Sequence, residues 1–310
     1  MTTTAATTRI VLFGATTPSG DALLQQALND PSLELRVAGR RPPINRPGVR
    51  FVPCDLRQPQ HWPGPEGDER TEGETAQVWL SFAPIWELAP FLAALAAERP
   101  AALTGVRGVV ACSSSSVITK RFATNGFDRA LVRRLQEAEE LLERSSRALG
   151  LTSVVLAPTL IYGASGSYVD RNLSRLSGLL RRLPLLPVPG VTGLRQPLHC
   201  SQLAAVALYL ARRLAAPSLQ PSLPQRLAVG GDETLSYRAM LEQLRKTNGG
   251  AALLPLPPRL FYALAAPLLL LNPKQFEAVL RMGADLAGFT SAHQLLGGAP
   301  QPFPVLPLGR

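Results

Sequence analysis

The stretch Arg9-Ile-Val-Leu-Phe13, followed by Gly14-Ala-Thr-Thr-Pro-Ser-Gly20, decides the fold expected for this chain. The apolar run predicts a buried strand, and the residues after the turn predict a helix over Asp21–Asn29. Such a strand–turn–helix unit can bring backbone amides and a helix N-terminus close to a phosphate. We expect Gly14 to form the tight turn and Gly20 to let the helix pack closely on the strand. The alternative is an ordinary β–α turn without a ligand.

Short apolar runs continue to alternate with helical stretches over the first 160 residues. This alternation is typical of βαβ units and a parallel sheet. We therefore predict an α/β fold, with a Rossmann-type doubly wound parallel sheet over residues 1–160. The further expected elements are strands at Glu34–Ala38, Val49–Val52, Gln77–Phe82, Gly108–Cys112 and Val154–Ala157, and a helix at Arg129–Leu149.

After residue 160 the pattern changes, because proline becomes frequent and helices such as Gln202–Ala215 stand between irregular segments. Residues 161–310 are expected to form a smaller, mostly helical substrate lobe, with a strand at 226–229 returning to the main sheet. An apolar helix around Leu260–Leu271 is expected either in the core or as a docking surface. Residues 62–77 place five acidic side chains among glycines and prolines, which predicts a solvated loop insertion without an assigned function.

The composition excludes several classes of protein. A chain of 310 residues with 46% hydrophobic residues can bury a core without disulfide or metal staples. The net charge of +10 comes mostly from arginine, since only three of the 32 basic residues are lysine, and these arginines are spread along the chain. No basic run alternates with aromatic residues, so nucleic-acid binding is not expected. The three cysteines and three histidines lack ligand spacing, so we expect no metal site.

The same sequence predicts a cytoplasmic protein. The N-terminus lacks the basic and apolar regions of a signal peptide. The longest uncharged apolar stretch, from Leu260 to Pro273, is shorter than the roughly 17–25 residues that span a bilayer, so no transmembrane segment is expected.

The second strand ends in Ala38-Gly39-Arg40-Arg41, at the position that faces the adenosine ribose in dinucleotide-binding folds. An acidic residue at this position would accept the 2′-hydroxyl of NAD, whereas the forked guanidinium group suits the 2′-phosphate of NADP. No acid is present, so we expect NADP, with NAD as the second choice. Asp55, after the third strand, is expected to accept a hydrogen bond from the adenine amino group.

Several segments together resemble the NAD(P)-dependent epimerase/dehydratase family, an extended or atypical branch of the short-chain dehydrogenase/reductase superfamily. They are Gly14–Gly20, Asp55-Leu56, Leu80–Ala83, Val109–Ser116, Ala157–Gly163, Arg195–His199 and Leu227–Gly231. The resemblance implies a bound nicotinamide dinucleotide and oxidoreductase or epimerase chemistry on a small molecule. The cofactor-binding residues expected from the turn, the strand ends and this resemblance are Gly14, Thr16, Thr17, Pro18, Ser19, Gly20, Arg40, Arg41, Asp55, Leu56, Ser81, Phe82, Ala83, Ser114 and Pro158.

The catalytic centre departs from the family pattern. Family members carry Tyr-x-x-x-Lys on the helix after the fifth strand, where the lysine lowers the pKa of the tyrosine that exchanges a proton with the substrate. Leu131 and Leu135 occupy those positions here, and none of the five tyrosines has a lysine four residues later. The remaining catalytic candidates are Ser115, Lys120 and Tyr162, with a strand-capping serine, a surface lysine and a core tyrosine as the respective alternatives.

Asn172, Arg195 and His199 are expected near the substrate, because the resemblance places an anionic or nucleotide-sugar-like molecule there. A core histidine is the alternative for His199. Two functions remain open: an enzyme with an atypical proton relay, or a non-catalytic dinucleotide-binding protein with a structural, assembly or sensor role. The sequence does not predict the oligomeric state.

Overall fold

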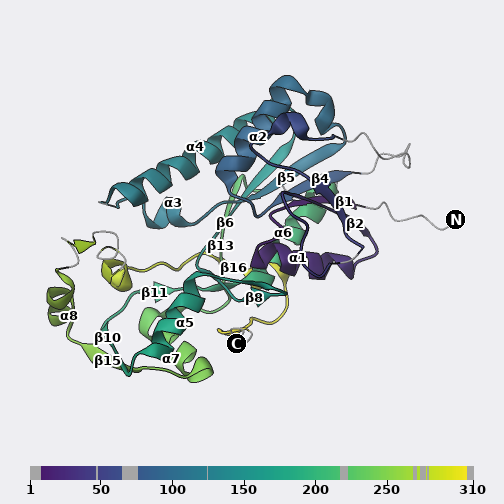
Figure 1. The fold of residues 1–310 in the computed structure, drawn as a ribbon. Coiled ribbons are helices and arrows are strands. Elements are labelled where there is room, and N and C mark those ends of the chain that lie inside the picture. The colour runs from purple at the N-terminus through teal and green to yellow at the C-terminus, as the bar shows by residue number, and fades with distance from the viewer. Residues whose placement is uncertain are drawn as a thin grey trace.

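A computed structural model describes residues 8–46, 48–64, 76–123, 125–216, 223–267, 271–272, 277 and 279–305. One eight-stranded parallel sheet runs through the molecule in the order β16-β13-β6-β5-β4-β1-β2-β3 (Figure 1). This topology confirms the predicted Rossmann-type α/β fold. The strands are β1 Thr8–Phe13, β2 Leu33–Gly39, β3 Arg50–Pro53, β4 Gln77–Ser81, β5 Val106–Cys112, β6 Thr152–Pro158, β13 Arg226–Gly230 and β16 Thr290–Ser291.

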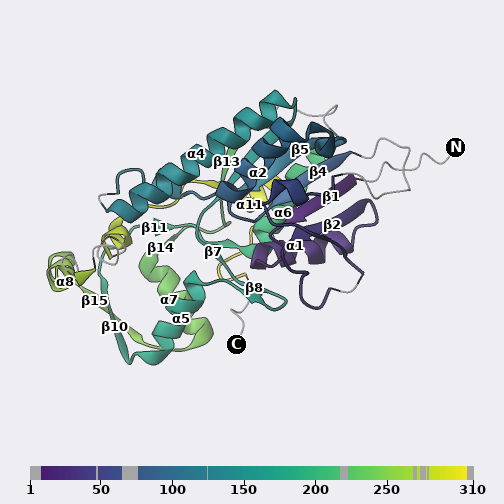
Figure 2. The ribbon, with the colours of Figure 1, turned by 45° about the horizontal axis from the view of Figure 1, so that its top comes forward.

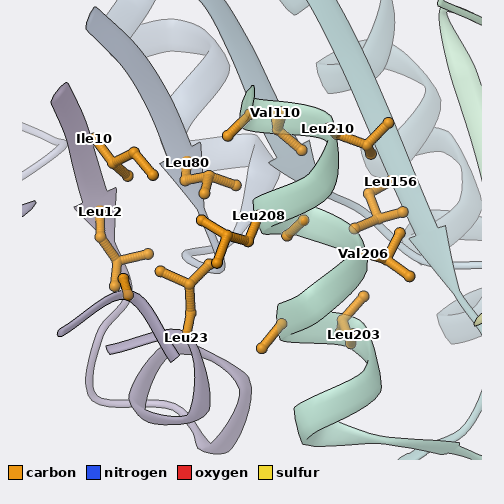
Figure 3. Packing of buried hydrophobic residues seen from close by; sticks show 14 of the residues in the cluster. Ile10, Leu12, Leu23, Leu80, Val110, Leu156, Leu203, Val206, Leu208 and Leu210 are labelled. Carbon is orange, nitrogen blue, oxygen red and sulfur yellow. The ribbon is translucent and has the colours of Figure 1, made fainter. Parts of the chain in front are cut away.

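Both faces of the sheet are covered by helices, which explains the nearly continuous apolar strands. Successive strand residues point to opposite faces, so Ile10 and Leu12 enter one hydrophobic core while Val11 and Phe13 enter the other. The first core lies under α1 (Pro18–Leu28) and α6 (Cys200–Ala215), as Figure 3 shows. The second lies under α2 (Ile85–Glu98) and α4 (Gly126–Ala148), which pack against each other (Figure 2).

The boundary expected at residue 160 does not separate the two parts of the molecule in space. Helix α6 follows that boundary in sequence, yet Leu203, Val206 and Leu210 are buried against the main sheet. Strand β13 pairs with β6, and β16 extends the sheet beyond β13. The helix α11 (Ala292–Leu296) packs on α6. Much of the C-terminal half therefore packs on or extends the main sheet, because these apolar segments complete its hydrophobic core.

The remaining C-terminal segments form the smaller lobe, which has a hydrophobic core of its own around Leu173, Leu180, Met240 and Leu244. The lobe contains β7 Ile161–Tyr162, β8 Ala164–Ser165, β9 Tyr168–Val169, α5 Asn172–Arg182, β10 Leu185–Pro189, β11 Leu194–Arg195, β12 Leu198–His199, β14 Leu235–Ser236, α7 Tyr237–Asn248, β15 Ala252–Leu256 and α8 Pro258–Ala265.

Two sequence expectations fall partly outside the described residues. Residues 65–75 of the acidic insertion and residues 268–270 of the expected apolar helix are not described. Trp62, at the start of the insertion, is buried among Phe13, Trp79 and Phe91 rather than solvated. In α8 only the Phe261 side chain is buried, so most of this helix does not belong to the core. Within the described chain, no helix combines the length and apolarity needed to cross a membrane.

Candidate active site

The turn after β1 has a backbone geometry that requires glycine at both ends. Gly14 has a φ of +79°, and a Cβ atom there would lie 2.5 Å from the Ala83 nitrogen. A Cβ atom on Gly20 would overlap the carbonyl oxygen of Gly14. The turn is therefore held against the end of β4 and against the first turn of α1, and only glycine tolerates these approaches.

Thr17 stands where the family spacing has its middle glycine, and its side chain is folded into the turn. Its Oγ1 donates a hydrogen bond to the Gly14 carbonyl (2.9 Å) and accepts one from the Gly20 amide (3.0 Å). Thr17 thereby caps α1, which begins at Pro18.

A cavity of about 960 Å³, here called the first cavity, opens at the C-terminal ends of β1, β2 and β3. Arg40 and Arg41 line it, and neither makes a hydrogen bond or ion pair with another described residue. Asp55 also lines it, and hydrogen bonds from Arg57 lower the pKa of its carboxyl group to about 2. The predicted residues lining this cavity are Gly14, Thr16, Thr17, Arg40, Arg41, Asp55, Leu56, Phe82 and Ala83.

A second cavity, of about 750 Å³, shares Thr16, Thr17, Phe82 and Ala83 with the first. The predicted residues Pro18 and Ser114 line it as well. Helix α4 contributes only two side chains to this lining, Leu131 and Leu135.

A third cavity, of about 630 Å³, shares Ser113, Ser114 and Ile161 with the second. The three cavities thus adjoin one another from the tip of β2 to the smaller lobe. Four cationic side chains line the third cavity, and no acidic side chain of the described residues does. Its basic residues are Lys120, Arg175, Arg195 and Arg281, and its predicted residues are Ser114, Ser115, Lys120, Pro158, Asn172 and Arg195.

Four serines follow β5, and they differ in what they bind. Ser113 donates to the Glu139 carboxylate, while Ser114 and Ser116 are hydrogen-bonded to each other at 3.0 Å. The backbone amide of Ser115 donates to the Pro158 carbonyl at 3.0 Å, but its hydroxyl has no partner among the described residues. The Ser115 hydroxyl is therefore available to a ligand in the third cavity.

Lys120 is not a solvated surface lysine. Its Nζ lies 2.8 Å from Oδ1 of Asp128, and Arg281 Nη1 lies 2.7 Å from Oδ2 of the same carboxylate. Asp128 is 2% exposed. Burial alone would raise the pKa of Asp128, but hydrogen bonds from Lys120, Asn125 and Arg281 hold it well below its ordinary value. Asp128 thus stays ionised and anchors two cations at the wall of the third cavity.

Tyr162 and His199 lie elsewhere. Tyr162 is fully buried, and its hydroxyl accepts a hydrogen bond from the Val305 amide at 2.8 Å. Burial raises the pKa of its phenol. The buried His199 ring packs edge-on against Tyr162. Its Nδ1 caps α6 by accepting a hydrogen bond from the Ser201 amide at 3.3 Å, and it also lies 2.7 Å from the Ser201 hydroxyl. Neither residue lines the three cavities. These contacts favour the alternatives given in the sequence analysis, a core tyrosine and a core histidine, over catalytic or substrate-binding roles.

Three further expected cofactor residues shape the turn without lining a cavity. Ser19 is buried in α1, Gly20 packs on Gly14, and the Ser81 hydroxyl accepts from the Ala83 amide at 3.2 Å. Arg195 does line the third cavity, but its guanidinium donates inward to the carbonyls of Leu194 and Ala284, each at 2.7 Å.

The sequence analysis missed other cleft residues, namely Tyr168, Arg171, Arg175 and Arg281. Their spacing carries no motif, because tertiary packing alone brings them to the cleft. The described residues contain no group of histidine, cysteine and acidic side chains that could hold a metal ion.

The eight-stranded sheet, the glycine turn and the adjoining smaller lobe form a Rossmann-type α/β fold, and solved nucleotide-sugar epimerases share it. Among solved structures, a UDP-galactose 4-epimerase matches with a TM-score of 0.63 and 15% identity, covering 95% of this chain and 94% of that chain. The UDP-glucuronic acid 4-epimerase of Bacillus cereus, in complex with NAD, matches with a TM-score of 0.58 and 13% identity over 95% and 94%. The NADPH-dependent quinone oxidoreductase of Escherichia coli, complexed with NADPH, matches with 0.55 and 16% over 88% and 87%.

No protein-family model matches the sequence, and no curated protein matches it as a relative. The likeness to solved structures therefore concerns the fold. At that level it confirms the fold that the resemblance to the epimerase/dehydratase branch implies.

Proposed function

We propose that the protein binds a nicotinamide dinucleotide, preferring NADP(H) to NAD(H), and uses it to oxidise, reduce or epimerise a small anionic or nucleotide-sugar-like substrate. The observation that carries this proposal is the series of three adjoining cavities that starts at the glycine turn. The first two suit a dinucleotide, and the third suits a substrate. Structural neighbours with this fold include complexes with NAD and with NADPH.

The residues of the first cavity fit the cofactor. Gly14, Thr16 and Thr17 of the turn line this cavity just before α1, where a pyrophosphate would meet the N-terminus of the helix. Arg40 and Arg41 offer forked donors that no described residue uses, as a 2′-phosphate requires. Asp55 stays ionised and can accept from an adenine amino group.

The bound nicotinamide would supply the hydride donor or acceptor. In the third cavity, the free Ser115 hydroxyl can donate a hydrogen bond to the carbonyl oxygen of the substrate. Lys120 lies on the same wall, and its ammonium group can stabilise negative charge on that oxygen or supply the proton. Asp128 fixes the position of Lys120 at 2.8 Å. Ser115 and Lys120 would thus replace the Tyr-Lys pair.

The cofactor assignment is tested by calorimetry with NADPH and NADH on the purified protein. Arg40→Ala and Arg41→Ala should each lower the affinity for NADPH about tenfold, since a charge-assisted hydrogen bond is lost. NADH affinity should change less than twofold. Arg182→Ala, which removes an exposed arginine outside the three cavities, is the control for lost charge. Equal losses for both coenzymes would contradict the preference for NADP, and absence of binding to the wild type would contradict the whole proposal.

A second candidate function is supported by one observation, the apolar contribution of α4 to the second cavity. Leu131 and Leu135 cannot exchange a proton, so the protein could retain a dinucleotide without turning it over. Mass spectrometry should identify the small molecules that co-purify, and NADPH deuterated at the nicotinamide C4 should be incubated with UDP-sugars and small carbonyl compounds. Loss of deuterium supports the enzyme, whereas tight binding with complete retention supports the non-catalytic protein.

A further inference from the structure

A buried carboxylate lies directly after the glycine turn and is explained neither by the proposed chemistry nor by the core. Asp21, in the first turn of α1, is 1% exposed. It accepts hydrogen bonds from Nε and Nη2 of Arg46, at 3.0 and 2.7 Å, and from the Ser165 hydroxyl at 2.7 Å. Gln25 donates to it at 3.1 Å. A carboxylate at this depth is stable only when it is paired in this way.

The partners of Asp21 come from the two segments that border the cofactor cleft. Arg46 lies on the connection between β2 and β3, which begins with Arg40 and Arg41. Ser165 belongs to the β8–β9 hairpin, whose Tyr168 lines both the first and the second cavity. One carboxylate in α1 therefore holds both the connection and the hairpin.

The connection and the hairpin also contact each other directly. The Tyr168 hydroxyl accepts a hydrogen bond from the Ile44 amide at 3.2 Å, and both residues line the first cavity. The hairpin turn approaches Asp21 closely, because a Cβ atom on Gly166, whose φ is +53°, would lie 2.8 Å from Oδ2. Helix, connection and hairpin thus form a closed set of contacts beside the cleft, here called the clasp: Asp21, Arg46, Ser165, Tyr168 and Ile44.

Electrostatics explain why the pairing matters for an anionic ligand. An unpaired carboxylate in the first turn of α1 would repel a pyrophosphate bound at that helix N-terminus. The bidentate guanidinium of Arg46 compensates this charge while keeping the geometry rigid. The pair therefore fixes the loop that carries Arg40 and Arg41 at little electrostatic cost to the phosphate site.

We infer that Asp21 is a positioning residue for the dinucleotide: through Arg46 it places the 2′-phosphate loop, and through Ser165 it places the hairpin that retains the bound cofactor. This inference rests on the proposed function, since it presupposes a dinucleotide in the first two cavities. It assigns a specificity role to the Asp21–Arg46 pair and a retention role to Tyr168.

Specificity is tested by measuring NADPH and NADH affinities of three variants. Asp21→Asn should lower the ratio of NADPH to NADH affinity about five- to tenfold, because the 2′-phosphate loop loses its anchor. Arg46→Gln should weaken both coenzymes, because the carboxylate is left buried and uncompensated. The double variant Asp21→Asn/Arg46→Gln should recover NADH binding but not the preference for NADPH. Thermal melting of each variant confirms that it is folded.

Retention is tested by stopped-flow displacement of NADPH, followed by its fluorescence. Tyr168→Phe should raise the dissociation rate about fivefold, since the acceptor for the Ile44 amide is lost. Tyr209→Phe, on α6 and outside the three cavities, is the matched control and should dissociate like the wild type.

The outcomes separate the two proposals. A wild type that binds NADPH, together with variants that keep its affinity ratio and dissociation rate, overturns the clasp alone. A wild type that binds neither coenzyme overturns the proposed function and the clasp with it.

Discussion

Substitution of Ser115 is the most direct test of the proposed chemistry. We expect Ser115→Ala and Lys120→Ala to lower turnover of an identified substrate by about a hundredfold or more, as when one positioned donor or proton-transfer group is removed. NADPH affinity should stay within twofold, because neither side chain lines the first cavity. Steady-state kinetics and calorimetry measure the two effects.

The matched control is Ser153→Ala, which removes a hydroxyl near the N-terminal end of β6, away from the third cavity. It should leave turnover unchanged. Full activity of both Ser115→Ala and Lys120→Ala would show that other groups carry the proton transfer.

The buried His199 should make the free energy of unfolding depend on pH. Burial lowers the pKa of its imidazole to about 4, from an ordinary value of about 6.5, although the charge of Asp170 acts in the opposite direction. The unfolded state then binds a proton more readily than the folded state between these values. The stability contribution is complete above about pH 6.5 and is lost as the pH falls toward 4, by about 3 kcal/mol in total.

Urea unfolding at a series of pH values measures this loss. His199→Asn keeps a capping acceptor for α6 but does not titrate in this range. Its free energy of unfolding should therefore fall less steeply between pH 6.5 and 4 than that of the wild type. Parallel profiles for the two proteins would contradict a neutral, buried His199.

The start of α1 illustrates the scale of the element. The Thr17 hydroxyl accepts a hydrogen bond from the Gly20 amide, which has no partner within the helix. The same hydroxyl donates to the Gly14 carbonyl and so stabilises the turn. Thr17→Val should lower the free energy of unfolding by about 1 kcal/mol, the usual loss for an N-cap. Thr17→Ser should keep most of this stability because it retains the hydroxyl.

Circular dichroism during chemical unfolding compares these two variants. NADPH affinity should fall in Thr17→Val and not in Thr17→Ser, since the turn proposed to bind the pyrophosphate loses the hydrogen bonds of Thr17. Equal stability of Thr17→Val and wild type would show that the hydrogen bonds of Thr17 contribute nothing net.

At the scale of the whole molecule, Arg195 and Arg175 line the same cavity but have different surroundings. Arg195 is 6% exposed, and besides the Leu194 and Ala284 carbonyls it binds the Arg281 carbonyl and lies 5.1 Å from the Tyr237 ring. Arg175 is exposed and has no partner among the described residues. Arg195 therefore joins segments of the smaller lobe, whereas Arg175 is free to bind an anion.

We expect Arg195→Met to lower the free energy of unfolding by about 2–4 kcal/mol, because the backbone carbonyls of Leu194, Ala284 and Arg281 lose their donor. Arg175→Met should change stability by less than about 0.5 kcal/mol, as exposed substitutions usually do, but weaken binding of UDP as a probe. Urea unfolding and calorimetry measure the two quantities. A stable Arg195→Met protein that has lost UDP binding would instead assign the anion to Arg195.

The sequence by itself determined most strands of the sheet, the helices α1, α4 and α6, and the glycine turn after β1. The continuous apolar run RIVLF, whose side chains enter the two cores in alternation, and the glycine requirement at Gly14 are local properties, which a pattern of residue types expresses directly. The tip of β2, with Arg40 and Arg41, was found in the same way. These features depend on neighbours in sequence, and short-range backbone geometry constrains them.

Only the tertiary structure decided which polar residues reach the cleft. Tyr162 and His199 lie in family-like motifs, yet packing against Phe303 and Gly163 turns them into core residues. Conversely, Asp21 acquires its partners from Arg46 and Ser165, 25 and 144 residues away. Burial, and with it the pKa and the hydrogen-bonding partner of a side chain, is set by contacts that are distant in sequence, and residue spacing carries no record of them.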